Sequence, residues 1–123
     1  MADIRHHLVQ LRENALDIIT NLVQSLLAPP YRIDEFKSKL KKDRSIVYGL
    51  IKVVKNRSEY DLLKGLDDVA EYYCTVIERI GDVKMYVKMN RHDACYGYVA
   101  RIEKRLRLII GYWTIEIDRI DRG

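Results

Sequence analysis

The chain is poor in the residues that build turns. It has 123 residues but only six glycines and two prolines. A fold made of β-strands needs many tight turns, so this scarcity excludes an all-β protein. Hydrophobic residues make up 48% of the chain and charged residues 33%, a balance typical of a globular protein rather than a disordered one. We expect one domain over residues 1–123.

Long hydrophobic runs are missing too. The longest uncharged run, Ile18 to Tyr31, has 14 residues, whereas a membrane-spanning helix needs about 20. Charged residues near the N-terminus interrupt any stretch that could serve as a signal peptide. We therefore expect no membrane contact, and a cytoplasmic location or a place within a particle assembled inside a cell.

Cysteine is also scarce, and Cys74 and Cys95 alone do not form a disulfide framework. Cys95 falls on an apolar helical stripe and Cys74 beside one, so we expect two small buried hydrophobic side chains. A Cys74–Cys95 disulfide is the alternative. Glutamine and asparagine are rare beside abundant charge, which is typical of proteins from hyperthermophiles.

What the chain does have is a strong helical period. Apolar residues recur at alternating steps of four and three, which keeps them on one face of an α-helix. The clearest series run from Ile4 to Leu26, Phe36 to Val54, Leu62 to Ile80 and Cys95 to Ile120. Amphipathic helices of similar length with short connections pack as antiparallel neighbours. The sequence predicts an all-α, up-down four-helix bundle whose C-terminal helix is the longest.

Capping residues and helix breakers set the expected boundaries. The first helix is predicted from Asp3 to Leu27, where Pro29-Pro30 stops it. The second is predicted from Asp34 to Val54 or Lys55, and the third from Ser58 to Gly81.

Two positions leave the helical pattern ambiguous. Asp43 stands where an apolar residue is due, so residues 43–45 are expected to break the second helix. At residues 90–93 the chain either turns, with Asp93 capping a new helix, or continues as one helix from Val83 to about Ile120. We favour a kink or break at this point.

The net charge of +4 is unevenly spread. Residues 37–57 hold eight basic residues and one acidic, residues 58–82 hold two basic and seven acidic, and residues 83–107 hold seven basic and two acidic. In the first of these segments, six side chains at helical spacing form what we call the basic stripe: Lys37, Lys41, Arg44, Tyr48, Lys52 and Lys55. Arg101 and Arg105 form a comparable line in the last helix, between Tyr98 and Tyr112.

Basic rows with interleaved tyrosines suit a nucleic-acid backbone, because lysine and arginine release counterions from phosphates and aromatic rings stack on exposed bases. This favours a non-enzymatic, self-associating bundle that contacts nucleic acid without sequence specificity. The alternative is a solvated face, or one that pairs with the acidic helix of its own or a neighbouring subunit. The protein would then be structural, such as a scaffold, an adaptor or a virion subunit.

The end of the chain carries more apolar side chains than one antiparallel neighbour should cover. We expect this end to overhang and to be covered by self-association, most simply in a two-fold dimer. The expected interface residues are Ile109, Tyr112, Trp113, Ile117 and Ile120.

No catalytic or metal-binding motif stands out. Asp67 and Glu71 share a helix face, but that face is the outer one and no histidine lies nearby. His6 and His7 are adjacent and so point in different directions along a helix. We expect no metal, no cofactor and no catalytic residues.

One short segment resembles a known family. Arg91, Gly97 and Tyr98 match the spacing of the Arg-Asn-…-His-Gly-Tyr signature of HEPN ribonucleases, which are small helical bundles. Tyr96 stands where that family has its general-base histidine, and His92 where it has asparagine. Tyrosine, with a reference pKa of about 10, is a poor base at neutral pH. The resemblance implies a relative of these enzymes that lacks their catalytic histidine.

Overall fold

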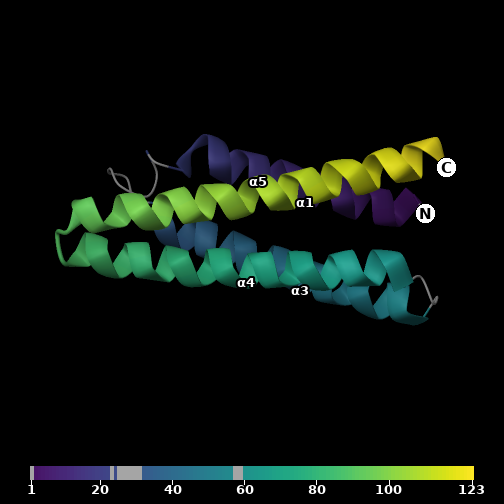
Figure 1. The fold of residues 1–123 in the computed structure, drawn as a ribbon, viewed down its shortest axis with the longest axis horizontal. Coiled ribbons are helices and arrows are strands. Elements are labelled where there is room, and N and C mark those ends of the chain that lie inside the picture. The colour runs from purple at the N-terminus through teal and green to yellow at the C-terminus, as the bar shows by residue number, and fades with distance from the viewer. Residues whose placement is uncertain (1, 23, 25–31, 57–59) are drawn as a thin grey trace.

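A computed structural model describes residues 2–22, 24, 32–56 and 60–123. These residues form four helices, α1 (Ala2–Thr20), α3 (Ile33–Asn56), α4 (Tyr60–Lys88) and α5 (His92–Arg122), and no strand. Successive helices run in opposite directions, so the all-α, antiparallel four-helix bundle is confirmed (Figure 1). The predicted first-helix end at Leu27 and third-helix start at Ser58 lie outside the described residues.

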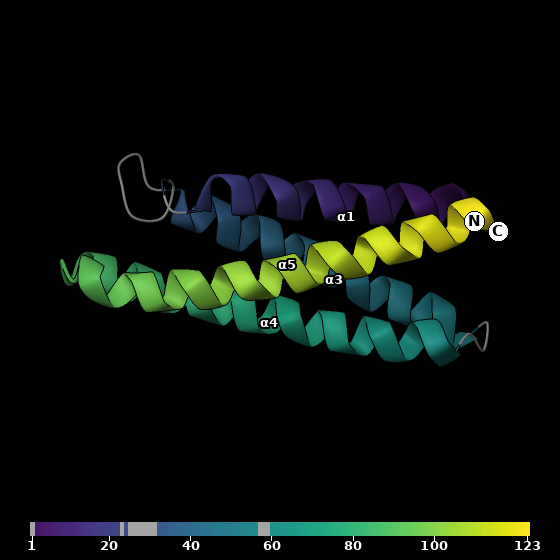
Figure 2. The ribbon, with the colours of Figure 1, turned by 45° about the horizontal axis from the view of Figure 1, so that its top comes forward.

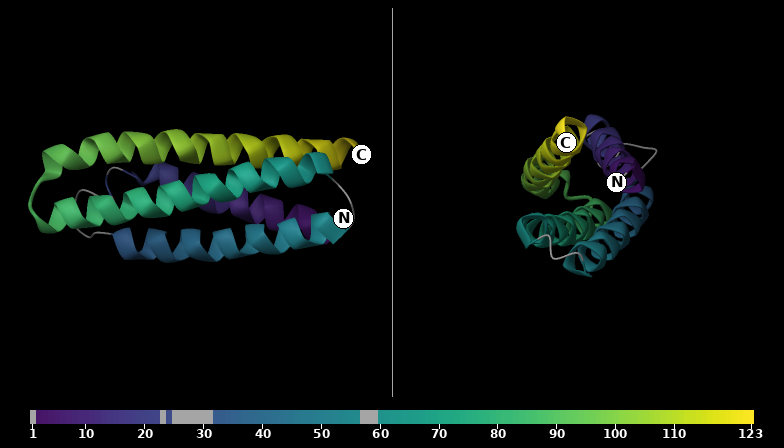
Figure 3. Two further views of the ribbon diagram at one scale, coloured as in Figure 1. Left: turned by 60° about the horizontal axis from the view of Figure 1, so that its bottom comes forward. Right: turned by 90° about the vertical axis from the view of Figure 1, so that its right-hand side faces the viewer.

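The helices form a ring with four corners. α4 packs against α3 and α5, and α1 packs against α5 and, less extensively, α3. Seen along the bundle, α3 and α5 occupy opposite corners (Figure 3). A surface on the outer side of α3 is therefore separated from one on the outer side of α5 by a whole neighbouring helix.

The apolar stripes form the core where the helices meet. Trp113, Tyr73 and Phe36 are the largest side chains that are fully buried. Each aliphatic side chain buried around them contributes roughly 1.5–3 kcal/mol from the removal of apolar surface from water. The four predicted apolar series thus account for the packing of the bundle.

The break expected at residues 43–45 is wrong, because α3 runs unbroken from Ile33 to Asn56. Asp43 is only 2% exposed and points into the bundle. The Asn14 side-chain amide donates to Oδ1 and Oδ2 of Asp43 at 3.1 and 3.3 Å. A donor from the neighbouring helix satisfies the carboxylate, so an acid can occupy an apolar position without breaking the helix.

The end predicted at Gly81 is also wrong, because α4 continues to Lys88. Val83 keeps the apolar stripe going beyond the glycine and is fully buried. The helix ends in a Schellman motif in which Asn90, at a φ of 57°, takes the left-handed position. The amide of Asn90 donates to Val87 O at 3.0 Å, and that of Arg91 to Tyr86 O at 2.9 Å.

The break expected at residues 90–93 is confirmed, since α5 begins at His92. The cap is Arg91 rather than Asp93, which lies in the first turn of the new helix. The Asp93 carboxylate instead lies 3.7 Å from the Arg91 guanidinium.

The C-terminal end of α5 does not overhang. Arg5, near the start of α1, donates from Nε and Nη2 to the two carboxylate oxygens of Asp121 at 2.6 and 3.1 Å. The two ends of the chain therefore lie together at one end of the bundle (Figure 2). Ile109, Trp113 and Ile117, which were expected to need a partner, are buried within the single chain.

Both cysteines are free, so the alternative of a Cys74–Cys95 disulfide is wrong. Cys95 is buried, as expected, with its thiol 3.8 Å from Val83 O. Cys74 is only half-buried and lies at the edge between α4 and α3.

Candidate functional site

The basic stripe lies along the edge of α3 that faces α4. Arg44 Nη1 and the Tyr48 hydroxyl each lie 3.5 Å from the Cys74 sulfur on α4. The hydrogen bond with Cys74 raises the pKa of the Tyr48 hydroxyl. These contacts fix the middle of the stripe to the body of the bundle.

Three lysines of the stripe are exposed, namely Lys41, Lys52 and Lys55. Among the described residues, none of the three lies within ion-pair distance of an acid. The ion pairs of α3 lie elsewhere, on its α1 side between Lys39 and Asp17 and at its start between Asp34 and Lys84. The three ammonium groups are therefore available to an anion from outside.

The acidic helix does not neutralise the stripe. Asp67, Asp68 and Glu71 are exposed on α4. Over the part of the chain that is described, no ion pair joins any of them to α3. The sequence left open that the acidic residues of α4 form ion pairs with the basic stripe of the same chain. The described side chains do not form such pairs.

The second basic row belongs to a different edge of the bundle. The Arg105 guanidinium lies 5.3 Å from the centre of the Tyr72 ring, and that of Arg101 lies 5.7 Å from the Tyr98 ring. Tyr98 itself stacks on Tyr86 with ring centres 5.5 Å apart. The Arg105–Tyr72 and Tyr86–Tyr98 contacts join α5 to α4, whereas the Arg101–Tyr98 contact lies within α5, so the tyrosines serve packing here.

The two basic rows do not form one surface. α4 lies between α3 and α5 and presents Asp68 and Glu71 between the rows. The sequence grouped Arg101 and Arg105 with the stripe because periodicity places residues on a face but does not say which helices adjoin.

The predicted interface residues are mostly inside the bundle. Ile109, Trp113 and Ile117 are buried within a single chain, and Ile120 is partly buried against the core. The edge of the Tyr112 ring lies over Gly65 of α4 and packs against Trp113. Core packing accounts for these residues, and the outer face of α5 carries a different set of apolar side chains.

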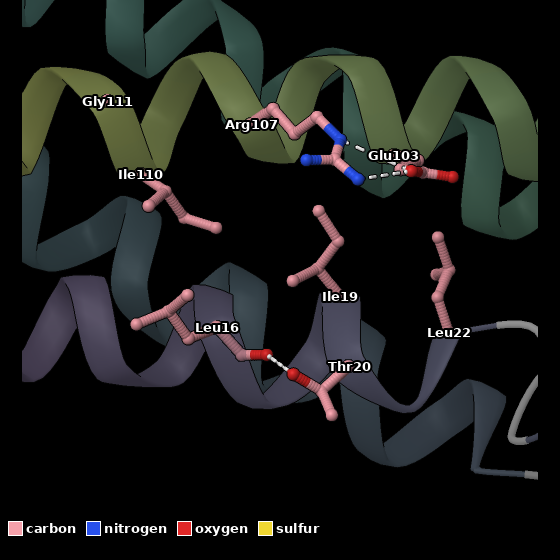
Figure 4. A pocket seen from close by; sticks show the side chains of 8 residues that line it. All are labelled: Leu16, Ile19, Thr20, Leu22, Glu103, Arg107, Ile110 and Gly111. Carbon is pink, nitrogen blue, oxygen red and sulfur yellow. Dashed lines mark hydrogen bonds and ion pairs between the residues drawn. The ribbon is translucent and has the colours of Figure 1, made fainter.

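A groove of about 510 Å³ runs between α1 and α5 (Figure 4). Leu16 and Ile19 from α1 face Ile110 and Gly111 from α5 across it. At one edge Arg107 Nη2 donates to Glu103 Oε1 at 2.8 Å. The sequence analysis missed this groove because the pairing of α1 with α5 cannot be read from the spacing within either helix.

A metal site and a membrane-spanning helix each place specific requirements on the described residues. No group of three His, Cys, Asp or Glu side chains is placed to hold a metal ion. Across the same residues, none of the helices has the length and apolar character needed to cross a bilayer. In the segment that resembles HEPN ribonucleases, Tyr96 is exposed and Tyr98 is held against Tyr86.

No protein family, no curated protein and no solved structure matches this chain. The surfaces of the bundle are therefore the only indication of its function.

Proposed function

We propose that this protein is a non-enzymatic bundle that binds nucleic-acid phosphates through the basic stripe of α3, without reading sequence. The observation that carries the proposal is the set of exposed lysines, Lys41, Lys52 and Lys55, which have no acidic partner among the described residues. Their neighbours Arg44 and Tyr48 are held in place by Cys74. The helix is therefore a rigid support for a row of mobile cations.

The dimensions of the stripe suit a phosphate backbone. From Lys37 to Lys55 it is about 27 Å long at 1.5 Å per residue. Phosphates on one strand of duplex DNA follow each other at about 3.4 Å along the axis, so the stripe spans several of them. Lysine side chains are long enough to adjust to the curvature of the backbone. No base-reading element accompanies the stripe, so the binding should not depend on sequence.

The test compares two triple variants with the same change in net charge. The variant Lys41→Glu, Lys52→Glu, Lys55→Glu removes the exposed lysines and leaves Arg44 against Cys74. The control variant Lys88→Glu, Arg91→Glu, Arg122→Glu changes three exposed cations that do not belong to α3. All six lie off the core, so both variants should fold like the parent.

Binding is measured by fluorescence anisotropy with a labelled duplex DNA at several salt concentrations. The parent and the control should bind with a dissociation constant of about 1–100 μM at physiological salt, with a steep slope against log salt. The stripe variant should lose binding at least about ten-fold and flatten the slope. Equal binding by both triple variants would show that only net charge matters and would overturn the proposal.

The second candidate is a structural protein assembled through opposite charges. It is favoured by the exposed acids Asp67, Asp68 and Glu71 on α4, which could meet the stripe of a neighbouring copy. In that case the stripe variant should lose a multimer that the parent forms without nucleic acid. Light scattering of both proteins, in low and high salt, separates the two functions.

A further inference from the structure

The outer face of α5 carries two large apolar side chains that do not contribute to the core. Leu108 is 42% exposed and Ile115 is 60% exposed, whereas other apolar residues of the same helix are buried in the core. Between them lies Gly111, where an added Cβ would meet nothing within 4 Å. Leu108, Gly111 and Ile115 follow steps of three and four, so they lie along one line on the outside of the helix.

We propose that a second copy of this chain docks here, with the two α5 helices antiparallel and crossing at Gly111 about a two-fold axis. In such a pairing, residues at about the same distance before and after Gly111 and on the same side of the helix face each other across the interface, and each contact occurs twice. A second copy is the expected partner because this face is complementary to itself in both its apolar and its charged residues. The proposal does not depend on nucleic-acid binding.

The first contact is apolar. Leu108 comes three residues before Gly111 and Ile115 four residues after it, on the same side of the line. The two-fold operation therefore brings Leu108 of one copy against Ile115 of the other, twice. Both side chains are covered without any change in the bundle. Since Gly111 has no side chain, the two backbones can approach closely at the crossing.

The second contact is electrostatic. Lys104 lies seven residues before Gly111 and Asp118 seven residues after it, two turns away on the same outer face. The pairing therefore places Lys104 of each copy opposite Asp118 of the other. Lys104 is exposed, and none of the described acids lies within ion-pair distance of it. Asp118 forms an exposed ion pair at 3.0 Å with Arg122 of its own helix, but its side chain is 57% exposed and so remains open to Lys104 of the other copy. A parallel pairing would instead set like charges opposite each other.

The groove between α1 and α5 widens this surface. Leu16 and Ile19 of α1 line this groove together with Gly111 (Figure 4). This adds apolar area next to the crossing point. The basic stripe on α3 lies at the opposite corner of the bundle and stays uncovered.

The first test uses two glycines of the same helix. Gly111→Arg places a long charged side chain at the crossing and should make the protein a monomer. Gly97→Arg is the matched control, because Gly97 is also exposed with nothing within 4 Å of its added Cβ. Gly97 lies 14 residues before Gly111, about 21 Å along the helix, so an arginine there stays away from the crossing. Both variants should keep the helical circular dichroism of the parent.

Analytical ultracentrifugation gives the mass at about 1–100 μM protein, a range in which dimers of ordinary affinity form. The parent and Gly97→Arg should have twice the 14.5 kDa of one chain, and Gly111→Arg should have that of a single chain. A monomeric parent, or a dimer that survives Gly111→Arg, would overturn the proposal.

The second test exchanges the charges. Lys104→Glu and Asp118→Lys should each weaken the dimer about ten-fold or more, because each sets like charges opposite each other twice. The double variant should restore the dimer, since every pair is again of opposite sign. Two single variants that weaken the dimer without rescue in the double variant would contradict the antiparallel register. A dimer unaffected by either change would place the interface elsewhere.

Discussion

Asn14 on α1 donates from its side-chain amide to both carboxylate oxygens of Asp43 on α3, at 3.1 and 3.3 Å. The contact lies at the inner edge of the two helices, where Asp43 is buried. Burial raises the pKa of Asp43 to about 6, and the hydrogen bond from Asn14 offsets part of this rise. The carboxylate therefore destabilises the folded protein when it is ionised.

The first prediction is that Asp43→Asn stabilises the protein at neutral pH. The pKa of Asp43 is higher in the folded protein than the reference value of 3.8, so the folded state favours the protonated form. Its contribution to stability is fully present below about pH 4 and is lost as the pH rises through about 6. The variant should match the parent at pH 4 and exceed it by up to about 3 kcal/mol at pH 8. Urea unfolding across this range measures the difference. If the difference in the free energy of unfolding did not change with pH, the raised pKa of Asp43 would be contradicted.

The second prediction concerns the donor. Asn14→Ala leaves the Asp43 carboxylate without its hydrogen bond and should cost about 2 kcal/mol at pH 8. The cost should be smaller at pH 4, because a protonated carboxyl is easier to bury than a charged one. Asn21→Ala is a suitable control, since the Asn21 side-chain amide donates to Asp17 one turn earlier and does not contact Asp43. An equal loss at both pH values would mean that Asn14 acts through packing alone.

The third prediction concerns the buried pair of Trp113 on α5 and Tyr73 on α4. Trp113 Nε1 donates to the Tyr73 hydroxyl at 3.1 Å, and both side chains are fully buried. Trp113→Ala should lower the free energy of unfolding by about 3–5 kcal/mol, because it empties a large core volume. Tyr73→Phe keeps the ring and should cost only about 1–3 kcal/mol, the penalty of a buried donor left without its acceptor. Chemical unfolding followed by circular dichroism measures both. An unchanged midpoint for Trp113→Ala would contradict the packing.

The fourth prediction is that two glycine-to-alanine changes have opposite signs. An added Cβ at Gly65 would lie 2.6 Å from Tyr112 Cε2 and 2.7 Å from its hydroxyl oxygen. Moving that ring against Trp113 should cost about 1–3 kcal/mol, more than the roughly 1 kcal/mol gained in helix propensity. At Gly49 nothing lies within 4 Å, so Gly49→Ala should stabilise the protein by up to about 1 kcal/mol. Thermal unfolding of the two variants decides whether α4 and α5 approach as closely as described.

The bundle could be predicted because four apolar series fixed which face of each helix is buried. The failures were local and have physical causes. Asp43 looked like a helix breaker because the sequence does not show that Asn14 of another helix supplies its donor. Gly81 looked like a helix end because glycine often follows one, but Val83 continues the buried stripe beyond it. The turn at Asn90 was favoured correctly, since asparagine tolerates the left-handed conformation.

The surfaces were harder to predict than the core. Periodicity placed the basic stripe on one side of its helix, and in the structure Arg44 of this stripe lies against Cys74 of α4. It could not show that Arg101 and Arg105 lie on another edge, held against Tyr98 and Tyr72. The C-terminal helix does carry many apolar residues, but the bundle itself buries most of them. Whether a surface residue is covered depends on which helices pack side by side, and that depends on contacts between residues far apart in the sequence.

The tight turn at Asn90 and Arg91 also bears on the order in which the protein folds. α4 and α5 share the most extensive interface in the bundle and are joined by only three residues, 89–91, so their ends meet at little cost in chain entropy. The contact of Arg5 with Asp121, by contrast, closes almost the whole chain into a loop. We expect the α4–α5 hairpin to form early in the transition state and α1 to dock last. Substitutions at the Tyr73–Trp113 pair should therefore slow refolding, whereas breaking the Arg5–Asp121 pair should mainly speed unfolding.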